Sequence, residues 1–285
     1  YAKYIFASFN QLTVALAAPS LFTIYHAPPR VEGALVIGIS QSGESPDIIA
    51  VVEHARRQNA PTIAITNSEN SSLARAAHDV ILQHAGDEQS IAATKTYTTQ
   101  LAALALLSAL IAPDATREKE LDGIVDAVAQ SLVLENICAE HAARWKEKQI
   151  ALIIGRGYNY ATAFEIALKL KELAYVAAEP YSSADFLHGP IALATNEMPV
   201  IVIAPRGSAQ NDLHDAAQQL RARDADVLEI SEDADAKIKL PVALPEWLSP
   251  FTAIIPGQLL ALHLAAAKGY DPDQPRGLTK ITRTR

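Results

Sequence analysis

An apolar run that ends in a serine-rich loop is the feature that most constrains how this chain folds. Residues 34–39 have the sequence Ala-Leu-Val-Ile-Gly-Ile, which predicts a strand buried on both faces. Residues 40–45 have the sequence Ser-Gln-Ser-Gly-Glu-Ser, and Pro46 suits the first turn of a helix, where an N–H has no partner. The loop therefore combines free backbone N–H groups with the positive end of a helix dipole, which favours phosphate or another anion. An ordinary turn with serine caps is the alternative.

Composition narrows the classes of partner. The chain has 285 residues, of which 49% are hydrophobic and 20% charged, so it can form one large or two ordinary globular domains. Its net charge of −8 disfavours nucleic acid and anionic membranes, and local donors must therefore bind any phosphate. The single cysteine, Cys138, excludes an internal disulfide and a cysteine-based metal site, which fits a cytoplasmic protein. The apolar run 101–112 is too short to span a membrane, and no two histidines have metal-ligand spacing.

Strands and helices alternate along the first half of the chain. We expect a short strand at 14–17, and after the serine loop a helix, a strand at 62–66, a short helix near Leu73 and a strand at 80–82. Two long helices are then expected, one at 92–112 and one at 116–145. This alternation is typical of an α/β fold with a parallel, doubly wound sheet.

The second half repeats the pattern of the first. When Gly43 is placed on Gly207, 164 residues later, residues 34–40 match 198–204 and residues 63–66 match 227–230 without a gap. Strand falls on strand and helix on helix, which predicts two α/β subdomains of one type. The strand at 150–154 and the glycine turn after it have no counterpart in the first half, so we expect that the first strand and first glycine loop of that half are missing from this sequence.

The two halves differ at the ligand loop. In the gapless alignment, Ser40, Gln41 and Ser42 match Ala204, Pro205 and Arg206, so the second half lacks the hydroxyl groups. We expect the first half to bind the anion and the second half to serve another purpose.

A charged face on an apolar helix is the main candidate for chemistry. Glu165, Lys169 and Glu172 are spaced i, i+4 and i+7, so they share one face of the helix predicted over 161–173. The remaining positions of this helix are mostly apolar, which favours a cleft lining over a solvated row of ion pairs.

Two further segments carry residues with chemical potential. His188 lies in a loop before a Gly-Pro turn, where it can titrate against a substrate or serve as a structural hydrogen-bond partner. Residues 269–280 are punctuated by proline and glycine and end at Lys280, a pattern too specific in its turns for a simple solvated coil.

Taken together, residues 38–45, 92–101, 165–172, 188–190 and 271–280 resemble the double-domain form of the sugar isomerase (SIS) family. Within that family they are similar to the isomerase half of glucosamine-6-phosphate synthase and to type II glucosamine-6-phosphate deaminases. The resemblance implies an α/β fold of two SIS-type subdomains, each a mainly parallel sheet between helices in a three-layer, flavodoxin-like arrangement. The implied domains are residues 1–145 with the phosphosugar loop, 146–268 with Glu172 and His188, and a tail at 269–285 that closes the site.

The resemblance also implies roles for individual residues. Glu172 would move a proton between carbons 1 and 2 with Lys169 beside it, His188 would assist ring opening, and Lys280 would cover the open-chain sugar and form an imine. The residues that would contact the sugar phosphate are Ser40, Gln41, Ser42, Ser45, Ile91, Ala93 and Thr279. The family builds its site from two subunits, so a homodimer is implied, and neither a cofactor nor a metal is implied.

Three functions remain in view. Ala93 stands where the synthase has serine, which removes one donor to the phosphate or the sugar. No glutaminase domain is recognised in the sequence, and this favours a deaminase that converts glucosamine 6-phosphate to fructose 6-phosphate and ammonia. The isomerase half of a glutamine-dependent synthase is the enzyme alternative. A sugar-phosphate sensor without turnover is the third, although a sensor has no need of Glu172, His188 and Lys280.

Overall fold

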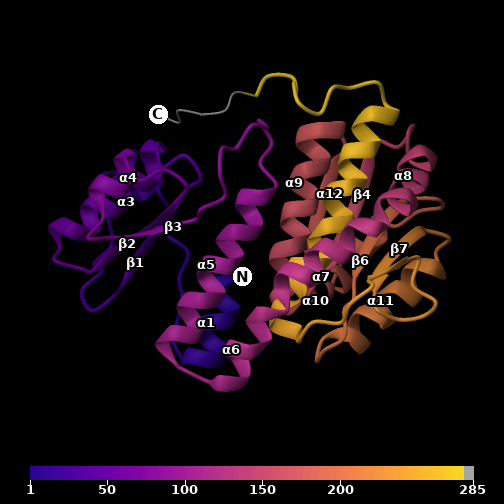
Figure 1. Ribbon diagram of the computed structural model, residues 1–285. Helices are drawn as coiled ribbons and strands as arrows, with labels where there is room; N and C mark the ends of the chain where they lie inside the picture. Colours follow the sequence, from indigo (N-terminus) through magenta and orange to yellow (C-terminus); the bar gives the residue numbers. More distant parts are fainter. Residues whose placement is uncertain (279–285) are drawn as a thin grey trace. The chain divides into compact units, whose positions relative to one another are not determined.

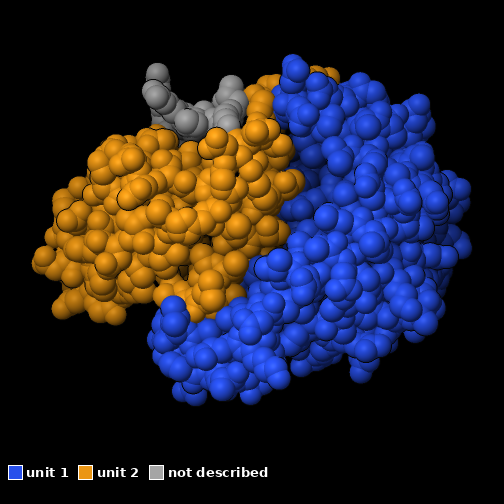
Figure 2. Space-filling model, in the orientation of Figure 1, with its two compact units in different colours: residues 1–12, 108–275 blue, residues 13–107, 276–285 orange. Residues whose placement is uncertain are grey.

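The computed structural model describes residues 1–278 of the chain, which form two compact units. Unit 1 consists of Tyr1–Leu12 and Ser108–Pro275. Unit 2 consists of Thr13–Leu107 together with residues 276–278 (Figure 2). Each unit contains a sheet in which all paired strands run parallel.

Unit 2 contains a sheet with the strand order β1-β2-β3 (Figure 1). Its strands are β1 (Val36–Ile39), β2 (Thr62–Thr66) and β3 (Asp79–Leu82). Its helices are α2 (Ser20–Thr23), α3 (Pro46–Arg57), α4 (Ser72–Ala76) and the larger part of α5 (Lys95–Ile111). The core forms where Val52 of α3 and Leu73 of α4 pack on Ala64 of β2.

Unit 1 contains a larger sheet with the strand order β5-β4-β6-β7-β8. Its strands are β4 (Ile150–Gly155), β5 (Ala177–Ser182), β6 (Pro199–Ile203), β7 (Asp226–Ser231) and β8 (Ile238–Lys239). Its helices are α1 (Ala2–Asn10), α6 (Ala115–Asp122), α7 (Ile124–Ser131), α8 (Glu135–Arg144), α9 (Tyr160–Ala174), α10 (Ser183–Leu187), α11 (Gln210–Arg221) and α12 (Ser249–Ala267). Four short 3-10 turns join them: η1 (Leu132–Leu134), η2 (Gly157–Asn159), η3 (Pro190–Leu193) and η4 (Glu246–Leu248).

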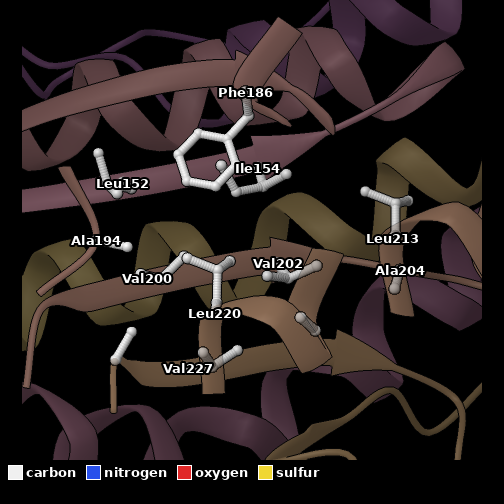
Figure 3. Packing of buried hydrophobic residues seen from close by; sticks show 12 residues of the cluster. Leu152, Ile154, Phe186, Ala194, Val200, Val202, Ala204, Leu213, Leu220 and Val227 are labelled. Carbon is white, nitrogen blue, oxygen red and sulfur yellow. The ribbon is translucent and has the colours of Figure 1, made fainter. Parts of the chain in front are cut away.

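The core of unit 1 lies around its central strands. Every residue of β6 is buried, as expected for a parallel strand covered on both faces. Apolar side chains of β4, β6 and β7 pack with Leu213 and Leu220 of α11 and with Phe186 of α10 (Figure 3). Elsewhere in the unit, α12 packs against α8 and α9. A Cβ at Gly257 of α12 would lie 2.3 Å from Cγ1 of Ile166, so this glycine allows α9 and α12 to approach closely.

One helical segment of unit 1 has the length and hydropathy of a membrane span. This segment, Glu246–Ala267, has a mean hydropathy of 1.4 over its most apolar window, and 67% of that window is buried inside the structure. Mostly buried core helices pass the same test, so the feature is weak support for a membrane span. It differs from the apolar run at 101–112, which sequence analysis considered as a membrane span and found too short.

The fold class predicted from the sequence is confirmed. The offset of 164 residues also places β1 on β6 and α3 on α11, but the strand pairing departs from it by one residue. Val36 pairs with Thr62 in unit 2, and Val200 pairs with Val227 in unit 1. The first strands are thus 164 residues apart and the second strands 165 apart. The buried positions of the intervening helices are also 165 apart, as Val52 and Ala217 show. The two loops between strand and helix are equally long, residues 40–45 and 204–209, so the difference of one residue lies in the pairing register and in which helix positions are buried.

Two secondary-structure predictions are also wrong. Residues 14–17 form no strand. In the repeat, residues 14–17 correspond to β5, an edge strand that pairs with β4. The described part of unit 2 has no strand in the place of β4, so residues 14–17 lack a strand with which to pair. The long helix expected over 116–145 is divided into α6, α7 and α8, with Gly123 as the end of α6 and the N-cap of α7. The helix expected at 92–112 is confirmed as α5.

Candidate functional site

The serine loop follows β1 in unit 2 and is held by its own side chains. The Ser40 N–H donates to the Ile65 carbonyl at 3.0 Å, which extends the ladder between β1 and β2. The hydroxyl oxygen of Ser40 accepts from the Gly43 N–H at 3.1 Å, and that of Ser42 accepts from the Glu44 N–H at 3.2 Å. These bonds fix the loop before any ligand binds.

Gly43 is required at the bend of this loop. Its φ of +67° lies in the left-handed region, and a Cβ there would lie 2.2 Å from the hydroxyl oxygen of Ser71. The next turn opens α3 at Ser45, which is the N-cap but makes no capping hydrogen bond with its side chain. The first N–H groups of α3 are thus without a side-chain cap, which is the arrangement that binds anions at helix N-termini.

An open cavity of about 500 Å³ lies beside the loop within unit 2. It is lined by Gln41, Ser42, Asn67, Ser68, Asp87, Glu88 and Gln89. Asn67 holds the wall in place, because its side chain accepts from the Ala85 N–H at 3.0 Å and donates to the Gly86 carbonyl at 2.7 Å. The cavity therefore brings together two of the predicted phosphate-binding residues. Ser40, Ser45, Ile91 and Ala93 are not among the residues that line it, and Ile91 and Ala93 lie partly buried just before α5.

Sequence analysis missed Asn67, Asp87 and Glu88. A signal for Asn67 was present, because it follows β2 just as the serine loop follows β1. The carboxyl ends of adjacent parallel strands lie at the same edge of a sheet, where ligands bind in open α/β folds. Asp87 and Glu88 belong to an irregular loop, for which the sequence offers no comparable rule.

Three of the four charged residues of α9, Glu165, Lys169 and Glu172, form a largely buried cluster in unit 1. Nζ of Lys169 lies 2.6 Å from Oε2 of Glu172 and 3.5 Å from Oε1 of Glu165. The exposed fractions of the side chains are 4% for Lys169, 12% for Glu165 and 23% for Glu172. Burial raises the pKa of the Glu165 carboxyl, although the Lys169 ammonium opposes the shift. The face is thus enclosed, in contrast to a solvated row of ion pairs.

The remaining predicted residues fall in different places. His188 follows α10 in unit 1, where its N–H donates to the Asp185 carbonyl at 3.3 Å and its side chain is exposed. No hydrogen bond joins its imidazole to the α9 cluster among the residues that the structure describes. Thr279 and Lys280 lie outside the described residues. The serine loop belongs to unit 2, whereas Lys169, Glu172 and His188 belong to unit 1.

The loop of unit 1 that corresponds to the serine loop is occupied by carboxylates of its own chain. The Arg206 N–H donates to Oε2 of Glu232 at 2.8 Å. The N–H groups of Ser208 and Ala209 donate to the carboxylate of Glu246 at 2.9 and 3.4 Å. Internal groups thus occupy the N–H donors that an anion would need, and this supports the view that the second half serves another purpose.

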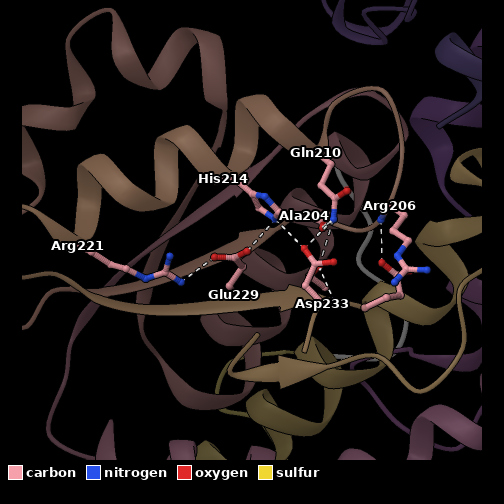
Figure 4. A network of polar contacts seen from close by, with 9 residues as sticks. Ala204, Arg206, Gln210, His214, Arg221, Glu229 and Asp233 are labelled. Carbon is pink, nitrogen blue, oxygen red and sulfur yellow. Dashed lines mark hydrogen bonds and ion pairs between the residues drawn. The ribbon is translucent and has the colours of Figure 1, made fainter. Parts of the chain in front are cut away.

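A network of polar side chains surrounds this second loop (Figure 4). Nε2 of His214 lies 3.0 Å from Oε1 of Glu229 and 3.3 Å from Oδ2 of Asp233. Arg221 pairs with Glu229 at 2.7 Å, and Gln210 donates to Asp233 at 3.1 Å. These contacts join α11 to the end of β7, and the polar side chains of the network bind one another.

Among residues 1–278, no group of three or more histidine, cysteine, aspartate or glutamate side chains is arranged to hold a metal ion.

The protein-family match and the similar curated proteins agree with each other. The family model described as the SIS domain matches residues 1–110 and 145–268. The chain is similar to glutamine–fructose-6-phosphate aminotransferase (isomerizing) of Pyrococcus horikoshii, with 37% identity over 289 residues that cover 98% of this chain and 48% of that protein. The protein of the same description from Bacteroides thetaiotaomicron is 38% identical over 295 residues, with the same coverage. The chain thus spans about half the length of these curated relatives.

Solved structures include two informative neighbours. The C-terminal domain of glucosamine-fructose-6-phosphate aminotransferase from Francisella tularensis has a TM-score of 0.88 and 32% identity, and the match covers 96% of this chain and 82% of that one. Glucosamine-6-phosphate deaminase from Thermotoga maritima has a TM-score of 0.83 with 22% identity, and the match covers 99% of this chain and 85% of that one. At that identity the second likeness concerns the fold alone.

Proposed function

Because the chain belongs to the SIS domain family, we propose that it is the isomerising half of a glutamine-dependent fructose-6-phosphate aminotransferase. The sequence alone favoured a deaminase, with this half as its alternative. The 37% identity to the aminotransferase over 98% of the chain supports the alternative instead, since the deaminase resembles the chain only in fold.

The buried cluster on α9 is the observation that carries the proposal. Conversion of a ketose phosphate to an aldose phosphate needs a base that removes a proton from carbon 1 and returns it to carbon 2. Glu172 supplies this carboxylate, and the ammonium of Lys169, 2.6 Å from its Oε2, holds it in position.

The other roles in the proposal follow the family resemblance. Ser40, Gln41, Ser42 and Ser45 bind the phosphate through hydroxyl, amide and backbone N–H groups, and His188 donates and accepts a proton during ring opening. Lys280 covers the sugar and forms an imine with its carbonyl, while Ile91, Ala93 and Thr279 contact the substrate. The proposed domains are residues 1–145, 146–268 and the tail 269–285. We also propose a cytoplasmic homodimer whose site is shared between subunits.

An assay with two substrates tests the function. The protein is incubated with fructose 6-phosphate, and glucose 6-phosphate is followed with a coupled dehydrogenase. In parallel, ammonia is followed after addition of glucosamine 6-phosphate without glutamine. Interconversion of the two hexose phosphates without ammonia release supports the proposal, and Glu172→Gln is expected to abolish it. Rapid ammonia release would instead support a deaminase, and tight binding without either reaction would support a sensor.

A further inference from the structure

A polar contact in unit 1 joins three elements at the carboxyl edge of its sheet. Gly155 ends β4 and pairs with Ser182, the last residue of β5. Arg156 and Ser183 follow these two, so both leave the sheet at the same edge. In the first turn of α11, Oδ2 of Asp212 accepts from the Ser183 hydroxyl at 2.5 Å and from Nη1 of Arg156 at 2.6 Å. One carboxylate oxygen thus joins the loop after β4, the start of α10 and the start of α11.

The exposure of these residues separates the contact from an ordinary surface ion pair. The side chains of Arg156 and Asp212 are 41% and 45% exposed, so their ion pair alone contributes little to stability. Ser183, however, is completely buried, with an exposed fraction of 0%. Its hydroxyl needs an acceptor inside the protein, and Asp212 provides it. The contact therefore acts chiefly at its buried end, where it fixes the start of α10.

The helix that begins at Ser183 is too short to hold itself in place. α10 has five residues, and isolated helices of this length are not stable. Its N-cap, Ser182, makes no capping hydrogen bond with its side chain. The Ser183 hydroxyl holds the first residue of the helix. Phe186 holds the fourth, because its ring is buried in the core beside Leu152 and Ile154 (Figure 3). One polar and one apolar contact thus anchor α10.

His188 takes its place from the same helix. It is the C-cap of α10, and its N–H donates to the Asp185 carbonyl at 3.3 Å. Its side chain is exposed, so the backbone of α10 sets its place rather than burial of the ring. A shift of the first turn of this helix therefore moves the imidazole as well.

We propose that Asp212 is a positioning residue, which through Ser183 and α10 holds His188 in place for ring opening. The inference rests on the proposed function, because it takes His188 as the group that assists ring opening. Loss of Asp212 then slows the opening of the sugar ring and leaves the later proton transfer by Glu172 intact.

Two sugars separate this role from general damage to the fold. Fructose 6-phosphate must open its ring before isomerisation, whereas 5-deoxyfructose 6-phosphate lacks the hydroxyl that closes the ring and stays open. Deuterium exchange at carbon 1 measures the reaction of both. For Asp212→Ala, kcat/KM with fructose 6-phosphate should fall about 10-fold or more, because a misplacement of about 1 Å can cost about 100-fold in rate. With the open-chain sugar it should stay within about twofold of the wild type. Ser183→Ala removes the same link from its other end and should give the same selective loss.

A matched control and a measurement without substrate complete the test. Asp215→Ala removes an exposed carboxylate from the same helix, α11, and should leave both rates unchanged. In nuclear magnetic resonance spectra of the unliganded protein, the His188 imidazole signal is assigned by its loss in His188→Gln. This signal should shift in Asp212→Ala and not in Asp215→Ala.

The contrary outcomes distinguish this inference from the proposed function. An unshifted His188 signal in Asp212→Ala, or equal losses of rate with the two sugars, would overturn the positioning role while the proposed function stands. Absence of exchange with both sugars in the wild type would overturn the proposed function, and with it the role of Asp212 in ring opening.

Discussion

The ammonium of Lys169 lies 2.6 Å from the carboxylate of Glu172, one turn along the same face of α9. Glu165, one turn earlier, is 3.5 Å from the same ammonium. One lysine thus neutralises one of two neighbouring carboxylates in a nearly enclosed position. Such an arrangement holds the Glu172 carboxylate in position, and several consequences can be measured.

Removal of Lys169 should destabilise the protein. Lys169→Met leaves two carboxylates facing each other without a cation in a poorly solvated position, and the expected loss is about 3 kcal/mol in the free energy of unfolding. Lys171→Met is the matched control, because Lys171 is exposed on the same helix. Its loss should stay below about 0.5 kcal/mol in urea unfolding. Equal losses in the two variants would show that the α9 cluster does not behave as a buried ion pair.

Protonation of Glu165 should make stability depend on pH. Burial raises the pKa of Glu165 above its ordinary value of 4.5, so the folded state keeps this proton over a pH range in which the unfolded chain has released it. The stabilisation is complete below the unfolded pKa and is lost as the pH rises through the folded pKa. Glu165→Gln stays neutral, so thermal melts should show the wild type losing stability relative to this variant as the pH rises above about 4.5.

Glu179→Gln, on an exposed position of β5, serves as the control for that series. A difference between wild type and Glu165→Gln that stays constant from pH 4 to pH 8 would contradict the assignment of a raised pKa to Glu165.

Substitution of Gly43 should be more harmful than substitution of Gly33. Both have positive φ angles, +67° and +74°, so alanine costs about 1–2 kcal/mol of backbone strain at either position. A Cβ at Gly43 would also lie 2.2 Å from the Ser71 hydroxyl oxygen, whereas a Cβ at Gly33 meets nothing within 4 Å. Gly43→Ala should therefore cost about 1–3 kcal/mol more in urea unfolding. It should also weaken sugar-phosphate binding, which Gly33→Ala should leave intact.

Asp226 should contribute more to stability than an ordinary surface carboxylate. It accepts from the Trp145 indole N–H at 2.7 Å and pairs with Arg144 at 2.6 Å. Because Trp145 is buried, Asp226→Ala leaves the indole N–H without its acceptor, at a cost of about 1–3 kcal/mol. Glu197 pairs with Lys148 at 3.4 Å and has a side chain that is 75% exposed, so Glu197→Ala should cost less than about 0.5 kcal/mol. Chemical denaturation measures the free energy of unfolding of both variants. A loss for Glu197→Ala as large as that for Asp226→Ala would contradict this ranking.

The alternation of strands and helices could be predicted because each buried strand is a continuous apolar run, whereas apolar residues recur at helical spacing in each helix. The register of the repeat could not. Every position of β6 is buried, so its sequence is apolar at both odd and even positions and a shift by one residue carries no penalty in pattern. The shift of one residue therefore became visible only in the strand pairing, where Val36 pairs with Thr62 but Val200 pairs with Val227.

The site could be predicted only in part, for a similar reason. Residues Glu165, Lys169 and Glu172 have helical spacing, and the structure encloses them together. Asp87 and Glu88 belong to an irregular loop whose path depends on the side chain of Asn67, which is 20 residues earlier than Asp87. No local pattern encodes such a contact. The occupation of the second loop by Glu246 depends in the same way on a distant segment, η4.

The most direct test of the account is exchange of the carbon-1 protons of fructose 6-phosphate with solvent. The protein is incubated with this sugar in deuterium oxide, and the proton signal at carbon 1 is followed by nuclear magnetic resonance. We expect deuterium incorporation with the wild type. At saturating sugar, Glu172→Gln should lower the rate of incorporation by about 100-fold or more. Saturable binding of fructose 6-phosphate without any exchange, or equal exchange by Glu172→Gln, would contradict the assignment of an isomerase with Glu172 as its base.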